Sequence, residues 1–329
     1  MAGSGKAHLR NNENVILRVE DLTMEFPAGG KNFVRAVSGI SFDIERGETL
    51  AIVGESGCGK STLGKAILQL PKPTSGSVNF QGQELTSLSK DALRDVRPAM
   101  QMIFQDPVSS LDPRLTVAKI VDEPLKIWER GDELWRSKKV DELLNAVGLD
   151  PALVRDRRSY EFSGGQCQRI SIARSLALEP LLLICDEPVS ALDVSVQAQI
   201  LNLLQDMKER YGLTLIFISH DLAVVKAVST RIMVMYLGKV CEISSPDELY
   251  SNPRHHYTHA LVSSVPVPDP TVAARGTALQ GEPPSPMDPP SGCRFRTRCP
   301  AATDLCAQEE PQLREVSAGH FVACHFPRN

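Results

Sequence analysis

The most informative part of the sequence is Gly54-Glu55-Ser56-Gly57-Cys58-Gly59-Lys60-Ser61-Thr62. It matches the pattern G-x-x-x-x-G-K-[S/T], in which the glycines let the backbone curl until successive N–H groups face one centre. An apolar run at 49–53 precedes it, and apolar residues at helical spacing follow it until Pro71, where we expect the helix to stop. A strand, this loop and a helix in succession predict a phosphate-binding loop. The alternative is a chance glycine-rich turn.

The loop has the groups that a nucleotide phosphate chain needs. Backbone N–H groups and the partial positive charge of a helix N-terminus attract phosphate oxygens. Lys60 would neutralise β- and γ-phosphate charge, and the Ser61 hydroxyl would ligate Mg²⁺. We therefore expect residues 54–62 to bind ATP. Cys58 could be a redox-active thiol, but a side chain that the tight turn tolerates is the simpler interpretation.

A second fixed point is the apolar run Leu181-Leu182-Leu183-Ile184-Cys185, which ends in two acids. In a P-loop nucleotidase the acid at the end of such a strand, here Asp186, would hold the Mg²⁺ shell. The next acid, Glu187, could polarise the attacking water, a general-base role worth ~10²–10⁴ in rate. The alternative is a solvated acidic strand end.

Composition and charge exclude several classes of protein. The chain has 329 residues, enough for about two domains. Its 36 basic and 40 acidic residues give a net charge of -4, so the chain has no general attraction to nucleic acid or anionic lipid. No apolar run approaches the ~18 residues that a membrane-spanning helix needs, and the polar start lacks the apolar region of a secretory signal. We expect a cytosolic protein that partners dock at a membrane.

The remaining pattern predicts an α/β core with a helical insertion. Residues 15–26 and 38–45 have strand character, and the apolar runs at 181–185 and 214–218 are typical of buried parallel strands. Helical spacing dominates between Asp106 and Glu161, with Ser137 as an N-cap and Gly148 as a stop. No chemical motif occurs twice.

Four further motifs resemble those of the ATP-binding subunits of ATP-binding-cassette (ABC) transporters, and the resemblance covers roughly residues 15–246. They are Gln105 in Ile103-Phe104-Gln105-Asp106-Pro107 (Q-loop), Ser163-Gly164-Gly165-Gln166 (signature), Ser190-Ala191-Leu192-Asp193 (D-loop) and His220 in Ile218-Ser219-His220-Asp221 (switch histidine). Phe26 lies where the family places an aromatic ring under adenine, and Phe33 is the alternative. Phe162 replaces the usual leucine before the signature, which is an apolar exchange.

The resemblance implies a P-loop NTPase of the ABC type at 15–250. Its parts are a RecA-like core, an antiparallel β subdomain and a helical subdomain at about 106–165. Gln105 would join Ser61 and Asp186 around Mg²⁺, and Glu187, His220 and Gln105 would form the catalytic set. The signature of one subunit would close over the ATP of the other, and Asp193 would be the D-loop aspartate. Because only one set of motifs is present, the working unit would be a dimer, and the resemblance favours a paralogous partner.

Residues 251–329 resemble the loop-rich C-terminal extension of oligopeptide and dipeptide importer ATPases. The stretches that carry this resemblance are His255-His256-Tyr257-Thr258, Val265-Pro266-Val267-Pro268-Asp269-Pro270, Gly281-Glu282-Pro283-Pro284-Ser285-Pro286 and Cys293-Arg294-Phe295. The histidines at 255, 256 and 259 could indicate a metal site, but an exposed polar turn explains them and no acidic ligand is interleaved.

Four cysteines in this extension have the spacing Cys293-x5-Cys299-x6-Cys306-x17-Cys324. A reducing cytosol argues against disulfides, so a metal staple is a natural interpretation. Structural zinc usually shows C-x₂₋₄-C pairs, whereas iron–sulfur clusters accept more varied spacing. The subfamily resemblance implies a structural [4Fe–4S] cluster. Zinc and unligated reduced thiols are the alternatives.

The resemblance implies an ATP-hydrolysing, energy-coupling subunit of an importer for di- or oligopeptides. Its partners would be a second ATPase subunit, two transmembrane permeases contacted by residues 106–128, and an extracytoplasmic peptide-binding protein. It would work at the cytoplasmic face of a bacterial-type membrane as a peripheral subunit, without nucleic acid. A nickel or sugar importer is one alternative. A soluble ABC-type ATPase of DNA repair or translation is another, but the sequence shows no second motif set, long coiled coil or basic surface.

Overall fold

The computed structural model describes residues 5–30, 32–265 and 281–329. The chain divides into two compact units. The first contains the chain up to Leu88 together with the chain from Phe217 onward, and the second is Ser89–Ile216. The stretch Pro266-Val267-Pro268-Asp269-Pro270, on which part of the subfamily resemblance rests, lies outside the described residues.

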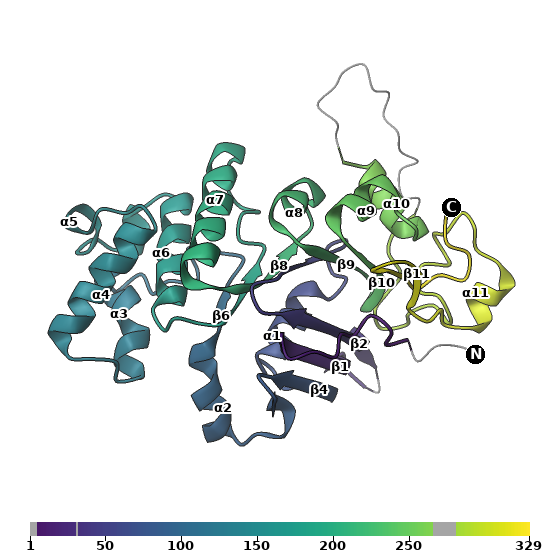
Figure 1. Cartoon of the computed structure of the whole chain (residues 1–329), viewed down its shortest axis with the longest axis horizontal. Coiled ribbons are helices and arrows are strands. Elements are labelled where there is room, and N and C mark those ends of the chain that lie inside the picture. Colours follow the sequence, from purple (N-terminus) through teal and green to yellow (C-terminus); the bar gives the residue numbers. More distant parts are fainter. Residues whose placement is uncertain (1–4, 31, 266–280) are drawn as a thin grey trace, which may run out of the picture. The chain divides into compact units, whose positions relative to one another are not determined.

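An antiparallel sheet opens the first unit, with strand order β2-β1-β4-β5. Val19, Leu22 and Met24 of β1 are buried, and a register shift between Val19 and Leu22 interrupts the alternation of apolar and polar residues along the strand. Figure 1 shows β1, β2 and β4 next to α1, which packs on β1 and β2. This sheet is the predicted antiparallel β subdomain. The elements are β1 (Val15–Pro27), β2 (Phe33–Glu45), α1 (Lys60–Ile67), β4 (Ser75–Phe80), β5 (Gln83–Glu84) and the 3-10 helix η1 (Leu85–Ser87).

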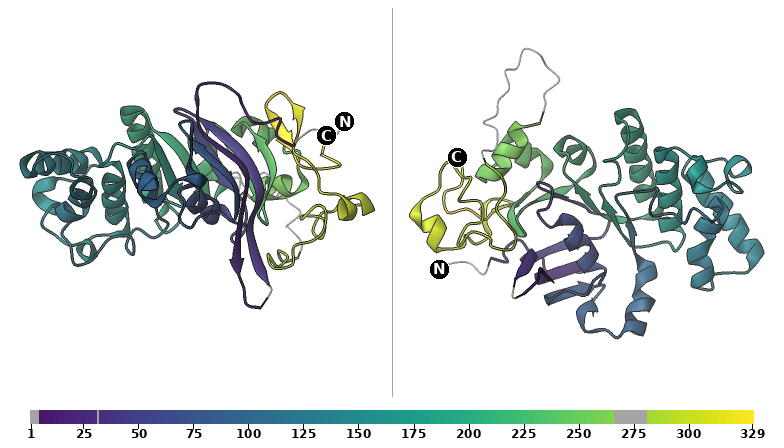
Figure 2. Two further views of the ribbon diagram at one scale, coloured as in Figure 1. Left: turned by 90° about the horizontal axis from the view of Figure 1, so that it is seen from below. Right: turned by 180° about the vertical axis from the view of Figure 1, so that it is seen from behind.

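A second sheet in the same unit has the order β11-β12-β10-β9-β3. The buried apolar strand β3 runs parallel to β9, with Leu50 opposite Arg231, as expected for a strand covered on both faces. From the C-terminal extension, β12 (yellow in Figure 2) pairs antiparallel with β10 (green). The extension therefore continues a sheet of the core. The strands are β3 (Thr49–Val53), β9 (Arg231–Tyr236), β10 (Lys239–Ser244), β11 (Arg314–Ser317) and β12 (His320–Val322).

The rest of the first unit is helix and loop. The described part of the extension is mostly loop, as predicted, because its prolines interrupt regular structure. The boundary between the two units falls inside the fully buried strand β8 (Thr214–Ser219). The helices are α8 (Leu222–Val228), α9 (Pro246–Ser251), α10 (His256–Ser263) and α11 (Asp304–Gln308).

The second unit combines a parallel strand pair with most of the helices. Strand β6 runs parallel to β7, with Ile103 opposite Cys185. Helices α3, α4 and α6 pack on one another through buried apolar residues such as Val121 and Leu144. The elements are α2 (Lys90–Val96), η2 (Arg97–Ala99), β6 (Met100–Ile103), α3 (Val117–Ile127), α4 (Glu133–Ala146), α5 (Pro151–Val154), η3 (Ser159–Glu161), α6 (Gly164–Leu176), β7 (Leu182–Asp186) and α7 (Val194–Tyr211).

Two local predictions about helix ends were wrong. The N-cap of α4 is Asp132, whose carboxylate accepts a hydrogen bond from the Trp135 N–H at 2.8 Å, and Ser137 lies inside the helix. An aspartate followed by Glu133 suits the positive helix N-terminus better than the later serine. Helix α1 ends at Ile67, before Leu70, because Gln69 adopts a left-handed conformation with φ 58°. The predicted stop at Gly148 is confirmed, since α4 ends at Ala146 and Gly148 has φ 74°.

The compact units differ from the predicted domains at 15–250 and 251–329. The unit that holds the extension also holds the N-terminal strands, and the second unit extends beyond the predicted helical subdomain at 106–165. The domain boundaries therefore stay predictions. In the part of the chain that the structure describes, no helix has the length and apolar character needed to cross a bilayer.

Candidate nucleotide-binding site

The predicted phosphate-binding loop connects β3 to α1 and needs glycine for steric reasons. A Cβ at Gly59, where φ is 103°, would lie 2.0 Å from the Ala36 carbonyl oxygen of β2. A Cβ at Gly54 would lie 2.1 Å from the Met235 carbonyl oxygen of β9. The loop is thus pressed against two strands, and only residues without a side chain allow this approach.

Lys60 places its positive charge inside the curve of this loop. Its ammonium donates hydrogen bonds to the carbonyl oxygens of Gly54, at 2.8 Å, and of Glu55, at 3.0 Å. The residue is only 4% exposed, so the charge stays at the loop. Ser61 and Thr62 follow in the first turn of α1, both half-buried. A cation and a helix N-terminus at one point are suited to a phosphate chain.

The Cys58 thiol is buried, with 5% exposure, and burial raises its pKa. The thiolate is the reactive form of cysteine, so a raised pKa argues against redox chemistry. The Cys58 carbonyl oxygen accepts a hydrogen bond from the Gly238 N–H at 2.9 Å, which ties the loop to the turn after β9. This favours the interpretation that the turn merely tolerates the side chain.

Three more predicted residues of the first unit lie at its surface. His220 is exposed and directly follows β8. Phe26 and Phe33 are 36% and 45% exposed, at the paired ends of β1 and β2. Both rings are open to solvent, so which of them stacks on adenine stays a prediction.

In the second unit, the structure brings Gln105 and Glu187 together. Gln105 Nε2 donates a hydrogen bond to Glu187 Oε2 at 3.1 Å. The two residues follow β6 and β7, and because these strands are parallel and in register their carboxyl ends lie at one edge. Asp186, the last residue of β7, is 2% exposed. The Q-loop glutamine and the proposed general base thus face each other beside a buried carboxylate.

The signature residues form the N-terminus of α6. The Ser163 hydroxyl accepts a hydrogen bond from the Gln166 N–H at 3.4 Å, and Gln166 Oε1 accepts one from the Ser163 N–H at 3.0 Å. This capping box leaves the helix end ordered and exposed, with the positive end of its dipole at the surface. A Cβ at Gly165 would lie 2.6 Å from Val196 Cγ1, so the glycine lets α6 approach the start of α7. Asp193, the D-loop aspartate, is the exposed N-cap of α7.

Comparison with known proteins accounts for this set of motifs. The family model described as ABC transporter matches residues 37–190, and the model described as Oligopeptide/dipeptide transporter, C-terminal region, matches residues 241–306. The Oligopeptide transport ATP-binding protein AppF of Bacillus subtilis is 50% identical over 324 residues, which are 96% of this chain and 98% of that protein. The chain is an ATPase subunit of the ABC transporter family.

Solved structures of ABC ATPases agree with the fold of this ABC subunit. One is a dimeric post-hydrolysis structure of the ATP-binding cassette MJ0796 bound to ADP and Pi, which is 30% identical in sequence with a TM-score of 0.64. The alignment covers 70% of the present chain and 98% of the MJ0796 chain. CbiO1 of Clostridium perfringens, part of the ABC transporter complex CbiONQ, is 31% identical with a TM-score of 0.64, over 73% of this chain and 92% of that one. The predicted P-loop NTPase fold of the ABC type is thereby confirmed.

Residue roles within this ABC subunit stay predictions. Ser61, proposed for Mg²⁺, belongs to the first compact unit, whereas Gln105 and Asp186 belong to the second. The same division separates His220 from Glu187. Within each unit, the geometry is compatible with the roles that the family motifs imply.

The cysteines of the C-terminal extension lie around one cavity. It is lined by Cys293, Cys299, Cys306, Cys324, His255, His256, Phe295, Arg296, Ala301, His325 and Phe326. The structure describes all eight cysteines of the chain, and each is a free thiol. Burial raises the pKa of Cys293 and Cys299, and raises that of Cys324 to about 11. Across the described residues, no three His, Cys, Asp or Glu side chains are grouped to hold a metal ion, so neither the predicted cluster nor the zinc alternative is shown.

The predicted exposed polar turn was wrong. The histidines at 255, 256 and 259 belong to the N-cap and body of α10, and none of them is exposed. His255 is 2% exposed, and its Nδ1 accepts a hydrogen bond from the Tyr257 N–H at 3.0 Å, which caps α10. His256 Nε2 lies 3.0 Å from the Phe326 carbonyl oxygen. These contacts tie α10 to the C-terminal segment.

Two residues to which the sequence assigned no role at the nucleotide contact the phosphate-binding loop. Arg298 and Tyr257, both from the C-terminal extension, bind Glu55. Arg298 lies 243 positions from Glu55 in the sequence, and no local pattern links residues so far apart.

Proposed function

We propose that this chain is the energy-coupling ATPase subunit of an ABC importer for di- or oligopeptides. The observation that carries the proposal is similarity over the full length. The cassette and the C-terminal region both match, and AppF, an oligopeptide transport ATP-binding protein, is 50% identical over 96% of the chain. A relative that shared only the cassette would say little about cargo, because many transporters use the same ATPase fold.

ATP is bound by two chains. The loop at 54–62 binds the phosphates of one ATP, with Lys60 as the counter-charge, and Phe26 stacks on its adenine. Ser163, Gly164, Gly165 and Gln166 of the other chain close over the same nucleotide, with Asp193 at the contact between chains. The exposed, capped N-terminus of α6 supports this role, because a helix end that faces solvent can receive an anion from another molecule.

Hydrolysis uses the residues at the ends of the strands. Ser61, Asp186 and Gln105 hold Mg²⁺, Glu187 polarises the attacking water, and His220 contacts the γ-phosphate. The hydrogen bond between Gln105 and Glu187 supports this arrangement, because it couples the Q-loop to the general base. The Q-loop then transmits closure at the γ-phosphate to residues 106–128.

The transport partners are two permeases, a second ATPase subunit that is a paralogue, and an extracytoplasmic peptide-binding protein. The chain works at the cytoplasmic face of the cell membrane. The exposed Phe104 and Val108, on either side of Gln105, support a permease contact near residues 106–128, since apolar side chains at a surface favour association.

The cavity of the extension holds a [4Fe–4S] cluster with a structural role. Support comes from the four cysteines Cys293, Cys299, Cys306 and Cys324, which all line one cavity in a segment that is mostly loop. The thiolates of such a cluster bind separate iron atoms, so they need not converge on a single ion. The cluster would join loops that bury little apolar surface of their own.

A single isolation experiment tests the transport function. The tagged chain is purified from its native host in a mild detergent, and the co-purifying proteins are identified. We expect two integral membrane subunits, a second ATPase and a solute-binding protein, whose bound ligand is then analysed. Bound peptide supports the proposal, bound nickel or sugar supports the alternative cargo, and a chain isolated without membrane proteins contradicts a transport role.

A further inference from the structure

Glu55, the second residue of the phosphate-binding loop, is held by an arginine of the C-terminal extension. Arg298 Nη1 lies 2.7 Å from Glu55 Oε2, and Arg298 Nη2 lies 3.1 Å from Glu55 Oε1. The pair is therefore bidentate, which fixes the orientation of the carboxylate as well as its position. The side chains are 4% and 24% exposed, so water screens this pair less than a surface ion pair.

A tyrosine of the extension holds the backbone of the same residue. The Glu55 N–H donates a hydrogen bond to the Tyr257 hydroxyl at 2.8 Å. Tyr257 lies in α10 and is fully buried, and burial raises its pKa, so the hydroxyl is neutral at physiological pH. Both the side chain and the backbone of Glu55 are thus fixed by residues outside the ABC cassette.

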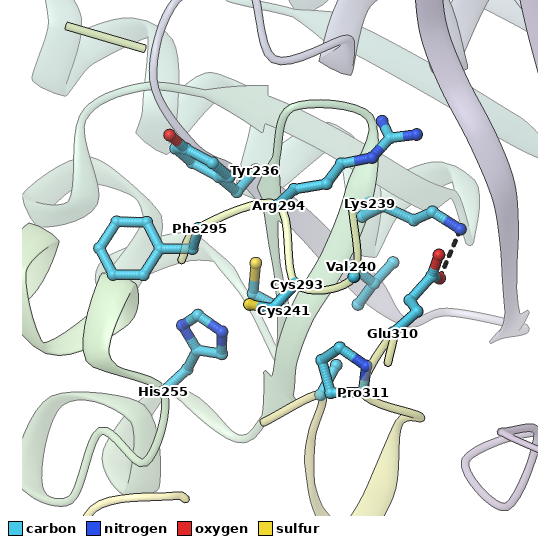
Figure 3. Close-up of a pocket in the computed structure, with 12 residues that line it drawn as sticks. Tyr236, Lys239, Val240, Cys241, His255, Cys293, Arg294, Phe295, Glu310 and Pro311 are labelled. Atoms are coloured by element: carbon cyan, nitrogen blue, oxygen red, sulfur yellow. Dashed lines mark ion pairs between the residues drawn. The ribbon is translucent and has the colours of Figure 1, made fainter. Parts of the chain in front are cut away.

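These two contacts rest on a rigid base of aromatic rings. Tyr236 of β9, Tyr257 and Phe295 pack edge to face or tilted, with ring centroids 4.7, 5.2 and 5.4 Å apart. The Arg298 guanidinium lies 5.8 Å from the centre of the Tyr236 ring. Figure 3 shows Tyr236 and Phe295 lining one pocket together with Cys293. The segment that carries the cysteines is therefore packed against the strand beside the phosphate-binding loop.

The neighbouring arginines of this segment have other partners. Arg294 donates to the carbonyl oxygen of Leu237, and Arg296 Nε donates to the carbonyl oxygen of Ser291 at 2.9 Å. Charge alone therefore does not explain the contact with Glu55. It requires the position that Arg298 takes beside Tyr236.

We propose that Arg298 and Tyr257 are positioning residues for ATP binding, which rests on the proposed function of this loop. Through Glu55, they hold the start of the loop in the curl that directs its N–H groups to the phosphates. Because the bidentate contact already restricts the loop before the nucleotide binds, the loop loses less conformational entropy on binding. ATP affinity thereby depends on the C-terminal extension being in place.

The test compares ATP binding by the full chain and its variants. The dissociation constant of Mg-ATP is measured by titration calorimetry for the wild type, Arg298→Met, Glu55→Gln and the double variant. We expect each single variant to weaken binding about tenfold, which is ~1.4 kcal/mol. The double variant should be no weaker than the single ones, because both substitutions remove the same contact. In hydrolysis assays KM should rise while kcat changes little, and Arg298→Lys should restore part of the affinity.

Lys239→Met is the matched control. Lys239 of β10 forms an ion pair with Glu310 of the extension at 2.6 Å, drawn as a dashed line in Figure 3. Its loss removes another link between extension and core, and ATP affinity should stay unchanged. Glu55→Gln leaves the extension intact, so it tests the contact even if Arg298→Met fails to fold. If Arg298→Met and Glu55→Gln both bind Mg-ATP as tightly as the wild type, the inference is overturned. If the wild type itself does not bind Mg-ATP, the proposed function is overturned.

Discussion

Glu187 combines an unusual backbone with a specific partner. Its φ of 47° lies in the left-handed region, which non-glycine residues rarely adopt, and its carboxylate accepts a hydrogen bond from Gln105. Such strain is typical of residues held in place for a function. It directly follows the buried Asp186, and Glu187 itself is half-buried.

We predict that Glu187→Gln keeps ATP binding and lowers turnover by ~10²-fold or more, because the amide cannot accept a proton from water. Phosphate release and nucleotide binding are measured on the same preparation. Glu179→Gln is the control, since Glu179 is also a left-handed glutamate of this unit, with φ 53°, but pairs with Lys139 at 2.6 Å. Near-normal hydrolysis by Glu187→Gln would refute the general-base role.

His8 makes stability depend on pH. It is 3% exposed, its Nε2 lies 2.7 Å from the Ser41 carbonyl oxygen, and its buried Nδ1 has no hydrogen-bond partner among the described residues. Burial lowers the pKa of His8 below its ordinary 6.5. Below pH 6.5 the unfolded chain therefore binds a proton that the folded chain resists, and stability falls as the pH falls.

We predict that lowering the pH from above 6.5 to below 6.5 reduces the free energy of unfolding less in His8→Gln than in the wild type. The measurement is urea denaturation at about pH 7.5 and pH 5.5, one unit on either side of the ordinary histidine value. The expected sign is a stability that rises with pH in the wild type. Equal slopes in both proteins would show that His8 does not titrate with unfolding.

At the scale of secondary structure, α6 and α4 both begin with a side-chain N-cap, but their proposed roles differ. Ser163 caps α6 at the signature, and Asp132 caps α4, where its carboxylate accepts a hydrogen bond from the Trp135 N–H at 2.8 Å. An N-cap residue replaced by alanine costs ~1 kcal/mol of stability in either helix. Only the end of α6 is proposed to receive a phosphate group.

We predict that Ser163→Ala and Asp132→Ala lose similar stability but differ in activity. Ser163→Ala should lower ATPase activity about tenfold, or ~1.4 kcal/mol, because the hydroxyl and the helix end are proposed to contact ATP bound by the other subunit. Thermal unfolding and ATPase rates are compared in the assembled dimer. If Asp132→Ala lowered activity equally, the loss would reflect stability and not the signature contact.

For the molecule as a whole, the extension and the phosphate-binding loop belong to the same compact unit. Strand β12 continues the sheet through β10, Arg298 and Tyr257 hold the phosphate-binding loop, and four cysteines line a cavity beside α10. The extension is therefore an integral part of the first unit. Whatever stabilises its loops also stabilises the contacts at Glu55.

We predict that the chain purified without oxygen is brown and contains about four irons and four sulfides. Cys324→Ser should lose this iron, because Cys324 lines the cavity, whereas Cys167→Ser should keep it, since Cys167 lies in α6 of the other unit. Iron, zinc and sulfide are measured on each protein. A colourless protein that contains zinc would contradict the cluster, and one without metal would support unligated thiols.

Much of the site could be predicted from local patterns. The glycines of the loop were predictable because a curled backbone allows few other residues, and the structure shows why, with strands β2 and β9 pressed against Gly59 and Gly54. The acids at the end of β7, Asp186 and Glu187, were predictable because they directly follow a continuous apolar run. Where two residues could each cap a helix, the local pattern did not decide between them: Ser137 was predicted as the N-cap of α4, but Asp132 is the cap.

The sequence by itself determined the phosphate-binding loop, the strand before it and the family motifs, since each depends on residues that are neighbours along the chain. Only the tertiary structure decided that Gln105 meets Glu187 across 82 positions, that Arg298 reaches Glu55 across 243, and that four cysteines share a cavity. Hydrophobic burial and strand pairing bring such residues together. Because both depend on the whole fold, the positions of two distant residues in the sequence do not show that they will be in contact.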